Sequence, residues 1–233
     1  MTIRLVVFDV AGTTVHDGDR VAARAMHEAL DRAGLTLRDG AMEGVAGMAK
    51  PEALRLLVEG HGRDELLPQL TAVHDDFVSR VLRHYRDANR VRAVDGAATT
   101  FAELRASGVQ VALGSGYSRP VLDCILTTLG WSADEPIIDA TIASDEVARG
   151  RPYPDMIDAL RTRLGGVPYS QVAKVGDTPI DLQEGTMARC GLVVGVLSGS
   201  GDRATLAQHP HDHLIDSVAQ LPELLDRLGQ MPA

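Results

Sequence analysis

Short apolar runs rich in β-branched residues recur along the chain, separated by stretches with helical spacing. The runs cover residues 3–10, 109–113, 137–142, 172–175 and 192–197. Runs of this length and composition are typical of parallel strands that are buried on both faces. Helical patterns lie between several of them, at 97–106, 120–129 and 154–164. The alternation predicts an α/β fold built on a doubly wound, Rossmann-like parallel sheet.

The pattern changes between the first strand and residue 94. Helical stretches lie near 20–33, 51–59 and 65–87, and no run in this part has the pattern of a strand. We therefore predict two domains. Residues 1–15 and 92–233 form the sheet domain, and residues 16–91 form an inserted helical domain.

Composition and charge narrow the classes of partner. The 233 residues are 45% hydrophobic and 24% charged, as in an ordinary globular protein, and the formal net charge is −9. That charge argues against nucleic acid, whose phosphates it would repel. The first apolar run is short and is broken by Asp9, and no run has membrane-spanning length. We expect a cytoplasmic protein that acts on a small molecule and does not bind a membrane.

Two other residue types give no independent sign of a site. Cys124 and Cys190 are too few for a disulfide framework and lack the spacing of metal ligands, so we expect buried packing residues. The stretch around His209, His211 and His213 is expected to be a surface loop.

Three polar residues follow predicted strands directly. Asp9, Ser115 and Asp177 each lie at or just past the carboxyl end of one apolar run. Doubly wound sheets bind their ligands beyond these strand ends. The three segments, although distant in sequence, are therefore predicted to meet in one crevice.

The first of these segments carries a family resemblance. Residues 9–14 read DVAGTT after the apolar run LVVF, which resembles the nucleophile motif of the haloacid dehalogenase superfamily. The resemblance implies that Asp9 attacks phosphorus and becomes an aspartyl-phosphate. It also implies that the inserted segment 16–91 is a helical cap that closes over the site, and that the protein is a homodimer joined through this cap.

Ala11 departs from the usual motif. Most phosphatases of the superfamily have a second aspartate there, which protonates the departing alkoxide. The pattern Asp-x-Ala-Gly-Thr is similar instead to the phosphonoacetaldehyde hydrolase (phosphonatase) subgroup, in which a carbon–phosphorus bond is cleaved. Its members form an imine between a lysine and the substrate aldehyde, because carbon leaves only as a stabilised carbanion. The resemblance implies phosphonoacetaldehyde or a close 2-oxoethylphosphonate as substrate.

The chain has two lysines, Lys50 and Lys174, among 23 basic residues. Where arginine supplies nearly every positive charge, a retained lysine suggests chemistry that guanidinium cannot perform, such as imine formation. Lys50 precedes Pro51, which predicts the start of a helix whose dipole would lower the pKa of the amine. The alternative is a solvated lysine that only attracts an anionic substrate. Lys174 is expected to be structural or supporting.

Residues 175–181, VGDTPID, resemble the acidic metal motif of the superfamily. The resemblance implies that Asp177, Asp9 and the backbone carbonyl of Ala11 bind Mg²⁺, a hard ion that prefers oxygen ligands. Asp181 is expected to be a supporting carboxylate. A turn in which an aspartate side chain bonds the backbone would also account for Asp181.

Two further motifs predict phosphate binding. Residues 114–117, GSGY, match the motif after the second core strand, in which the Ser115 hydroxyl and the Gly116 amide bind phosphoryl oxygens, with Tyr117 beside them. Thr13 is expected to assist. In residues 150–154, GRPYP, Arg151 takes the place of the superfamily lysine and is expected to clamp the phosphonate, a surface ion pair being the alternative.

Departures from the phosphonatase pattern cluster in the cap. This chain has Ala46, Ala53 and Asp19 where that enzyme has a methionine, a histidine and a cysteine. The residue that protonates the enamine is therefore open, with His16 and His27 as candidates. Two other functions also stay open: a phosphomonoesterase or phosphoglucomutase-like enzyme, and a catalytically silent protein that binds phosphate or a partner.

Overall fold

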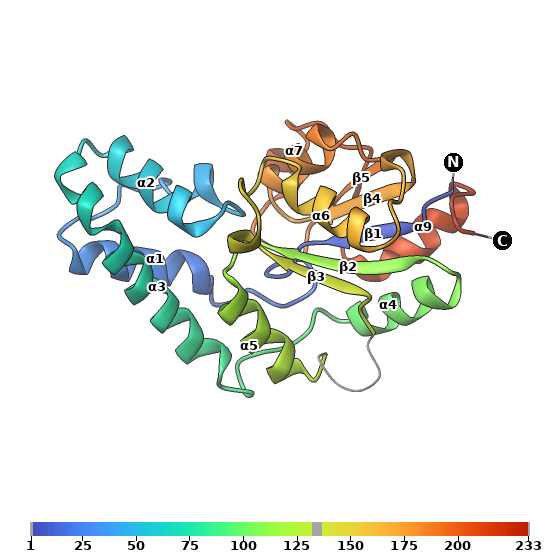
Figure 1. Ribbon diagram of the computed structural model, residues 1–233, viewed down its shortest axis with the longest axis horizontal. Helices are drawn as coiled ribbons and strands as arrows, with labels where there is room; N and C mark the ends of the chain where they lie inside the picture. The colour runs from blue at the N-terminus through green and yellow to red at the C-terminus, as the bar shows by residue number, and fades with distance from the viewer. Residues whose placement is uncertain (1, 132–136, 233) are drawn as a thin grey trace.

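A six-stranded, wholly parallel sheet forms the centre of the molecule (Figure 1). The computed structural model describes residues 2–131 and 137–232. The sheet has the strand order β3-β2-β1-β4-β5-β6. Its strands are β1 (Leu5–Phe8), β2 (Gln110–Ser115), β3 (Ala140–Ala143), β4 (Val172–Gly176), β5 (Leu192–Val196) and β6 (His213–Ile215). This is the order of a doubly wound fold, so the predicted fold class is confirmed.

Helices cover both faces of the sheet because alternate residues of each strand point to opposite sides. Val6 and Phe8 belong to the apolar cluster on one face, whereas Leu5 and Val7 belong to the cluster on the other. The first face packs against α4 (Ala97–Ala106), α5 (Arg119–Leu129) and α9 (Leu221–Arg227). The second packs against α6 (Asp155–Arg163), α7 (Pro179–Met187) and α8 (Arg203–Leu206).

The inserted segment is helical, as the sequence indicates. It contains α1 (Val21–Arg32), η1 (Glu43–Val45), α2 (Lys50–Gly60), η2 (Asp64–Gln69) and α3 (Leu70–Tyr85). The two linkers to the sheet lie side by side, because His16 N donates to Arg92 O and Val94 N donates to Thr14 O, both at 2.9 Å. We call residues 16–91 the cap; its boundaries stay a prediction.

The sequence pattern was wrong or incomplete in four places. The helix expected over 65–87 is divided, because Pro68 lies in the 3₁₀ turn η2 and α3 begins only at Leu70. Strand β6 begins at His213, where we expected a loop. Helix α2 begins at Lys50 itself rather than at Pro51. The two cysteines are free and only partly buried at the edges of the apolar clusters.

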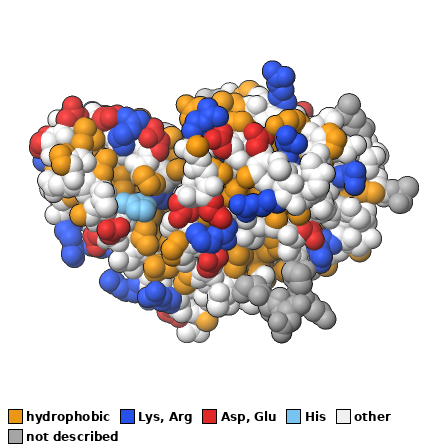
Figure 2. Space-filling model, viewed as in Figure 1, with side chains coloured by type: hydrophobic (Ala, Val, Ile, Leu, Met, Phe, Trp, Pro, Cys, Tyr) orange, Lys and Arg blue, Asp and Glu red, His pale blue; other side chains and the backbone are white. Residues whose placement is uncertain are grey.

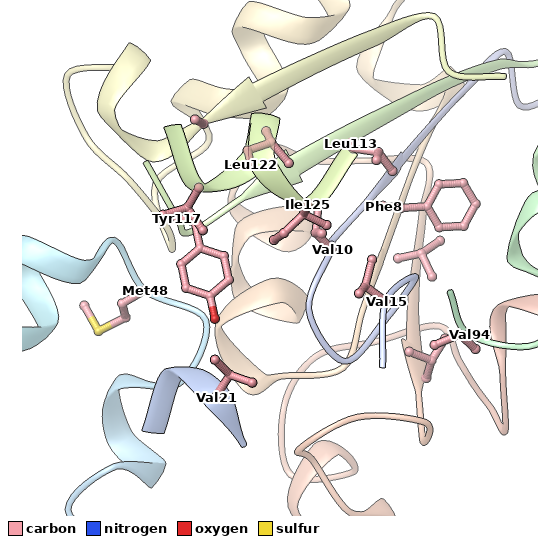
Figure 3. Close-up of a cluster of buried hydrophobic side chains, with 14 of the residues drawn as sticks. Phe8, Val10, Val15, Val21, Met48, Val94, Leu113, Tyr117, Leu122 and Ile125 are labelled. Atoms are coloured by element: carbon pink, nitrogen blue, oxygen red, sulfur yellow. The ribbon is translucent and has the colours of Figure 1, made fainter. Parts of the chain in front are cut away.

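One apolar cluster runs from the sheet into the cap (Figure 3). Phe8 and Leu113 lie at its strand end, and Met48 and Val21 lie at its cap end. The ring of Tyr117 lies between the two groups, with its hydroxyl directed toward Val21 (Figure 3). The shared core fixes the cap over the carboxyl edge of the sheet.

Figure 2 shows the resulting outline, with an indentation between the cap on the left and the sheet domain on the right. Acidic and basic side chains lie next to one another at the centre of this face. Among the described residues, no helix is long and apolar enough to cross a membrane.

Truncation of Phe101 tests the core beneath the site. Its fully buried ring packs against Phe8 and Trp131, with centroid distances of 5.2 and 5.3 Å. We expect Phe101→Ala to lower the free energy of unfolding by about 3–5 kcal/mol, through lost burial and a cavity. Urea denaturation followed by circular dichroism measures it. Leu228→Ala, at an exposed position, is the control and should lower it by less than about 1 kcal/mol.

Candidate active site

Asp9 lies one residue beyond β1, at the centre of the sheet. Its amide donates to Val175 O at 2.9 Å, which extends the pairing of β1 with β4 and holds the side chain at the strand ends. The carboxylate is buried and accepts a hydrogen bond from Nη1 of Arg151. Burial raises the pKa of Asp9, and the charge of Arg151 opposes this effect. The predicted nucleophile is therefore oriented by the predicted clamp.

Asp177 lies in the same position after β4, the neighbouring strand. It accepts hydrogen bonds from Thr13 Oγ1 at 2.9 Å and from Ser200 N at 2.7 Å. Thr13 was expected on the phosphate, but its hydroxyl is occupied by this carboxylate. Gly12, with φ of +95°, has to be glycine, since a Cβ there would lie 2.4 Å from Asp177 Oδ2.

Arg151 is the centre of a buried ionic network. Besides Asp9, its guanidinium pairs with Asp181 Oδ1 at 3.1 Å and with Glu184 Oε2 at 2.9 Å. Lys174 faces the same two carboxylates, at 3.0 Å from Asp181 and 2.8 Å from Glu184. Lys174 therefore supports the site through Asp181 and Glu184, as expected. The surface ion pair considered for Arg151 is wrong, because the Arg151 side chain is buried.

Sequence reasoning missed Glu184 altogether. It lies one turn after Asp181 on α7, so both carboxylates face the interior, and Glu184 is fully buried. The spacing Asp-x-x-Glu after the acidic motif was the available signal. Asp181 additionally caps α7 with Thr178, whose hydroxyl lies 2.5 Å from Asp181 Oδ2. Both readings of Asp181, helix cap and supporting carboxylate, therefore apply.

The acidic residues form a potential cation site. Carboxylate oxygens of Asp9, Asp177 and Asp181 lie within 4.8 Å of one another. Burial raises the pKa of Asp177 to about 7, and the charges of Asp9 and Asp181 add to the effect. Burial also opposes ionisation of Asp181, but Arg151 and Lys174 outweigh it and lower its pKa. Of these three residues, Asp9 and Asp177 have the carboxylates that protein cations neutralise least. Their oxygens are therefore suited to bind Mg²⁺.

The phosphate-binding segment follows β2. Ser115 is buried, and its Oγ accepts a hydrogen bond from Tyr117 N at 3.1 Å. Ser115, Gly116 and Tyr117 all face the same cavity as Asp9. The structure therefore brings the predicted phosphate-binding residues together, apart from Thr13.

Lys50 enters this cavity from the cap. It lies in the first turn of α2, and its Nζ donates to Met48 O at 2.9 Å and lies 5.3 Å from the ring centroid of Tyr117. Burial lowers the pKa of Lys50 to about 8, with Arg151 adding to the effect while Asp9 and Asp17 oppose it. The solvated lysine considered from the sequence is wrong, because the side chain is only 7% exposed.

The loop before Lys50 packs tightly on the sheet domain. A Cβ on Gly116 would lie 2.7 Å from Gly47 O, and one on Gly150 would lie 2.6 Å from the Cβ of Ala49. Gly47 itself has φ of +83° and approaches Thr178. These close approaches place the amine beside the strand ends, so the glycines are part of how the site is assembled.

The cavity between cap and sheet has a volume of about 340 Å³. Its walls include Asp9, Ala11, Lys50, Ser115, Gly116, Tyr117 and Arg151, together with residues that the sequence did not single out, such as Asp17, Met42, Thr178 and Ser200. Neither His16 nor His27 is among its lining residues. His16 is exposed and His27 lies partly buried on α1, so the geometry does not support either as the proton donor at Lys50.

Comparison with known proteins assigns the chain to a family. A model of the haloacid dehalogenase-like hydrolases matches residues 3–189. The chain belongs to this family. Members generally use Mg²⁺, in agreement with the buried aspartates.

Curated relatives share a more specific name. The chain is 29% identical over 220 residues to a phosphonoacetaldehyde hydrolase of Bacillus cereus (strain AH187), covering 87% of this chain and 78% of the relative. It is 27% identical over 270 residues to one of Pseudomonas fluorescens (strain SBW25), covering 99% and 96%.

Solved structures confirm the fold. A phosphonoacetaldehyde hydrolase-like protein from Oleispira antarctica has a TM-score of 0.84 at 21% identity, covering 98% of this chain and 93% of the other. A hydrolase from Pseudomonas syringae has a TM-score of 0.81 at 22% identity, covering 98% and 99%. Both neighbours share the α/β fold of this chain over nearly its whole length.

Substitution of Gly116 tests the contact between cap loop and sheet. In Gly116→Ala the new methyl group would push the backbone at Gly47 and Met48 away, which moves Lys50. Because displacement of a reacting group by about 1 Å costs roughly 10²-fold in rate, we expect a fall of that order in kcat/KM. Steady-state kinetics measures it. Gly44→Ala, in the 3₁₀ turn η1 of the cap and with open space around its Cβ position, should change kcat/KM by less than about twofold.

The two lysines differ in environment, and reductive methylation with formaldehyde tests the difference. With a pKa of about 8, roughly a tenth of Lys50 is free amine at pH 7, against less than about 0.1% for an ordinary lysine. We expect Lys50 methylation to rise with pH to a half-maximum near 8. Lys174, whose pKa is raised by Glu184 and Asp181 against the effect of burial, should stay unmodified. Peptide mass spectrometry measures the methylation of each lysine. Equal labelling of Lys50 and Lys174 in the folded protein would contradict the difference in their environments.

Proposed function

We propose that the protein hydrolyses the carbon–phosphorus bond of phosphonoacetaldehyde or a close 2-oxoethylphosphonate, with Mg²⁺ as cofactor. The observation that carries the proposal is the buried amine of Lys50, with its low pKa, in one cavity with Asp9 and Ala11. The names of the curated relatives support it. The homodimer implied by the family resemblance is part of the same proposal.

Position 11 lacks the acid with which most phosphatases of the family protonate a departing alkoxide. At Ala11 the wall is a methyl group, and no proton can come from that position. A carbon leaving group needs an electron acceptor rather than a proton at this point. Lys50 supplies one, since its free amine can condense with an aldehyde to an imine. The pair Ala11 and Lys50 therefore favours C–P cleavage over ester hydrolysis.

The proposed sequence uses the residues in the positions described. Lys50 adds to the carbonyl, water leaves, and a protonated imine forms. The phosphonate lies against Ser115 and Gly116, and an Asp9 oxygen attacks phosphorus while the C–P electron pair moves into the imine, giving an enamine. Protonation and hydrolysis of the enamine free acetaldehyde and the amine, and water then releases phosphate from Asp9.

Arg151 holds the attacking oxygen in place rather than acting on the phosphonate alone. Its Nε and one Nη are fixed by Glu184 and the Gly114 carbonyl, which directs the other Nη at Asp9. A phosphonate beside Asp9 would lie within reach of the same group. Mg²⁺, bound by Asp9, Asp177 and the Ala11 carbonyl, would reduce the repulsion between the carboxylate and the phosphonate.

Borohydride trapping tests the imine route. We expect phosphonoacetaldehyde, Mg²⁺ and borohydride to give one covalent adduct, confined to Lys50, by peptide mass spectrometry. Lys50→Ala and Lys50→Arg should form none and lose at least about 10³-fold in activity, because neither side chain forms the imine. Asp9→Asn should still form the adduct but release no phosphate. Full activity of Lys50→Ala would exclude the route.

A further inference from the structure

The enamine left by C–P cleavage needs a proton at carbon, and the cavity narrows the choice of donor. Its carboxyl-bearing walls are Asp9, Asp17, Glu43 and Asp202. Asp9 is the nucleophile and is paired with Arg151. Asp202 accepts a hydrogen bond from Thr205 N at 2.7 Å as the cap of α8, and Glu43 is exposed on η1. Asp17 is the partly buried carboxyl on the cap side, where Lys50 enters.

The turn before α1 fixes Asp17 in place. Its Oδ1 accepts a hydrogen bond from Val21 N at 2.9 Å, and its backbone carbonyl accepts one from Arg20 N at 2.9 Å. Arg20 has φ of +46°, an unusual conformation for a residue other than glycine. Within residues 2–131 and 137–232, no hydrogen bond or ion pair engages Oδ2. One oxygen is thus held and the other is available to the cavity.

Asp17, rather than Asp19, faces the cavity. Asp19 corresponds to the phosphonatase cysteine in the sequence comparison, but its side chain is 57% exposed and lies 3.9 Å from Nδ1 of His84. It is not among the lining residues. The turn at Arg20 therefore directs Asp17, and not Asp19, toward the cavity.

We infer that Asp17 is the catalytic proton carrier at the carbon freed by C–P cleavage, an inference that rests on the proposed function. The proton moves from the Asp17 carboxyl to the terminal enamine carbon, whose C=C electron pair forms the new C–H bond. The nitrogen lone pair then forms the C=N bond of a protonated imine. Water adds to that imine, acetaldehyde and the Lys50 amine leave, and the proton released returns to Asp17. Each turnover restores both groups.

The surrounding charges agree with this role. Burial raises the pKa of Asp17 and Asp19 adds to it, while the Val21 amide, Lys50 and Arg20 act in the opposite direction. A carboxyl group with a raised pKa keeps its proton to a pH closer to neutral, which suits a proton donor. Tyr117 also faces Lys50, but burial raises the pKa of its phenol well above the usual value, and its hydroxyl lies 3.4 Å from that of Tyr85. The phenol is therefore a poor proton donor.

Hydrogen exchange of acetaldehyde tests Asp17 apart from phosphorus chemistry. In D₂O the wild-type enzyme should exchange the methyl protons through the Lys50 imine and its enamine, seen as loss of the methyl signal by proton NMR. Asp17→Asn keeps an oxygen for the Val21 amide but has no carboxyl proton. We expect exchange at least about 10²-fold slower, the usual contribution of a general acid–base group. Asp19→Asn, with the same charge change two residues away, should exchange within about twofold of wild type.

A second measurement separates this inference from the proposed function. Asp17→Asn should still form the Lys50 adduct with phosphonoacetaldehyde and borohydride, melt near the wild-type temperature, and release about one phosphate per subunit in a burst. If Asp17→Asn forms the adduct and exchanges the methyl protons at the wild-type rate, the role of Asp17 is overturned while the proposed function stands. If Asp17→Asn melts well below the wild-type temperature and forms no adduct, Asp17 serves only to stabilise the start of α1, and the inference is overturned as well. No adduct on the wild-type enzyme overturns both proposals.

Discussion

The ionic network around Arg151 is the constraint on which the site depends. Two cations, Arg151 and Lys174, are buried with four carboxylates, those of Asp9, Asp177, Asp181 and Glu184. Removing either cation would leave buried carboxylates without a partner in a medium of low polarity, which is strongly unfavourable. Two negative charges remain in excess in this network, and the charges of Asp9 and Asp181 add to the effect of burial in raising the pKa of Asp177. A divalent cation, such as the proposed Mg²⁺, would offset that excess.

The same network explains why the two lysines behave differently. Lys174 lies between Asp181 and Glu184, and these charges keep it protonated in spite of complete burial. Lys50 is nearly as buried but has a carbonyl as its hydrogen-bond partner, and the nearby Arg151 opposes its charge. One lysine is therefore structural and the other a potential nucleophile, although both are the same side chain. The difference comes from partners that are remote in sequence.

Contacts between residues that are distant in sequence limit what the sequence alone can predict. Strand ends, the cap and the residues at 9, 115, 151 and 177 could be predicted because each belongs to a local pattern or a motif. Glu184 was missed because its partners lie 10 and 33 residues away along the chain. Asp17 was missed for a different reason: histidines were favoured by residue type, whereas the turn at Arg20 decides which side chain faces the cavity. Strand β6, with three residues, is too short to give a pattern.

The packing of the cap loop, residues 47–50, sets the chemistry of the Lys50 amine. Burial is the largest cause of the low pKa of Lys50, and that burial comes from the packing of residues 47–50 against Gly116 and Gly150. Withdrawal of the loop would return Lys50 to water, where an ordinary lysine is almost wholly protonated. An ammonium favours the approach of a dianionic phosphonate, and a free amine is required for the imine. In the proposed mechanism, closure of this loop would therefore convert the group that attracts the substrate into the group that reacts with it, and would exclude water from the imine.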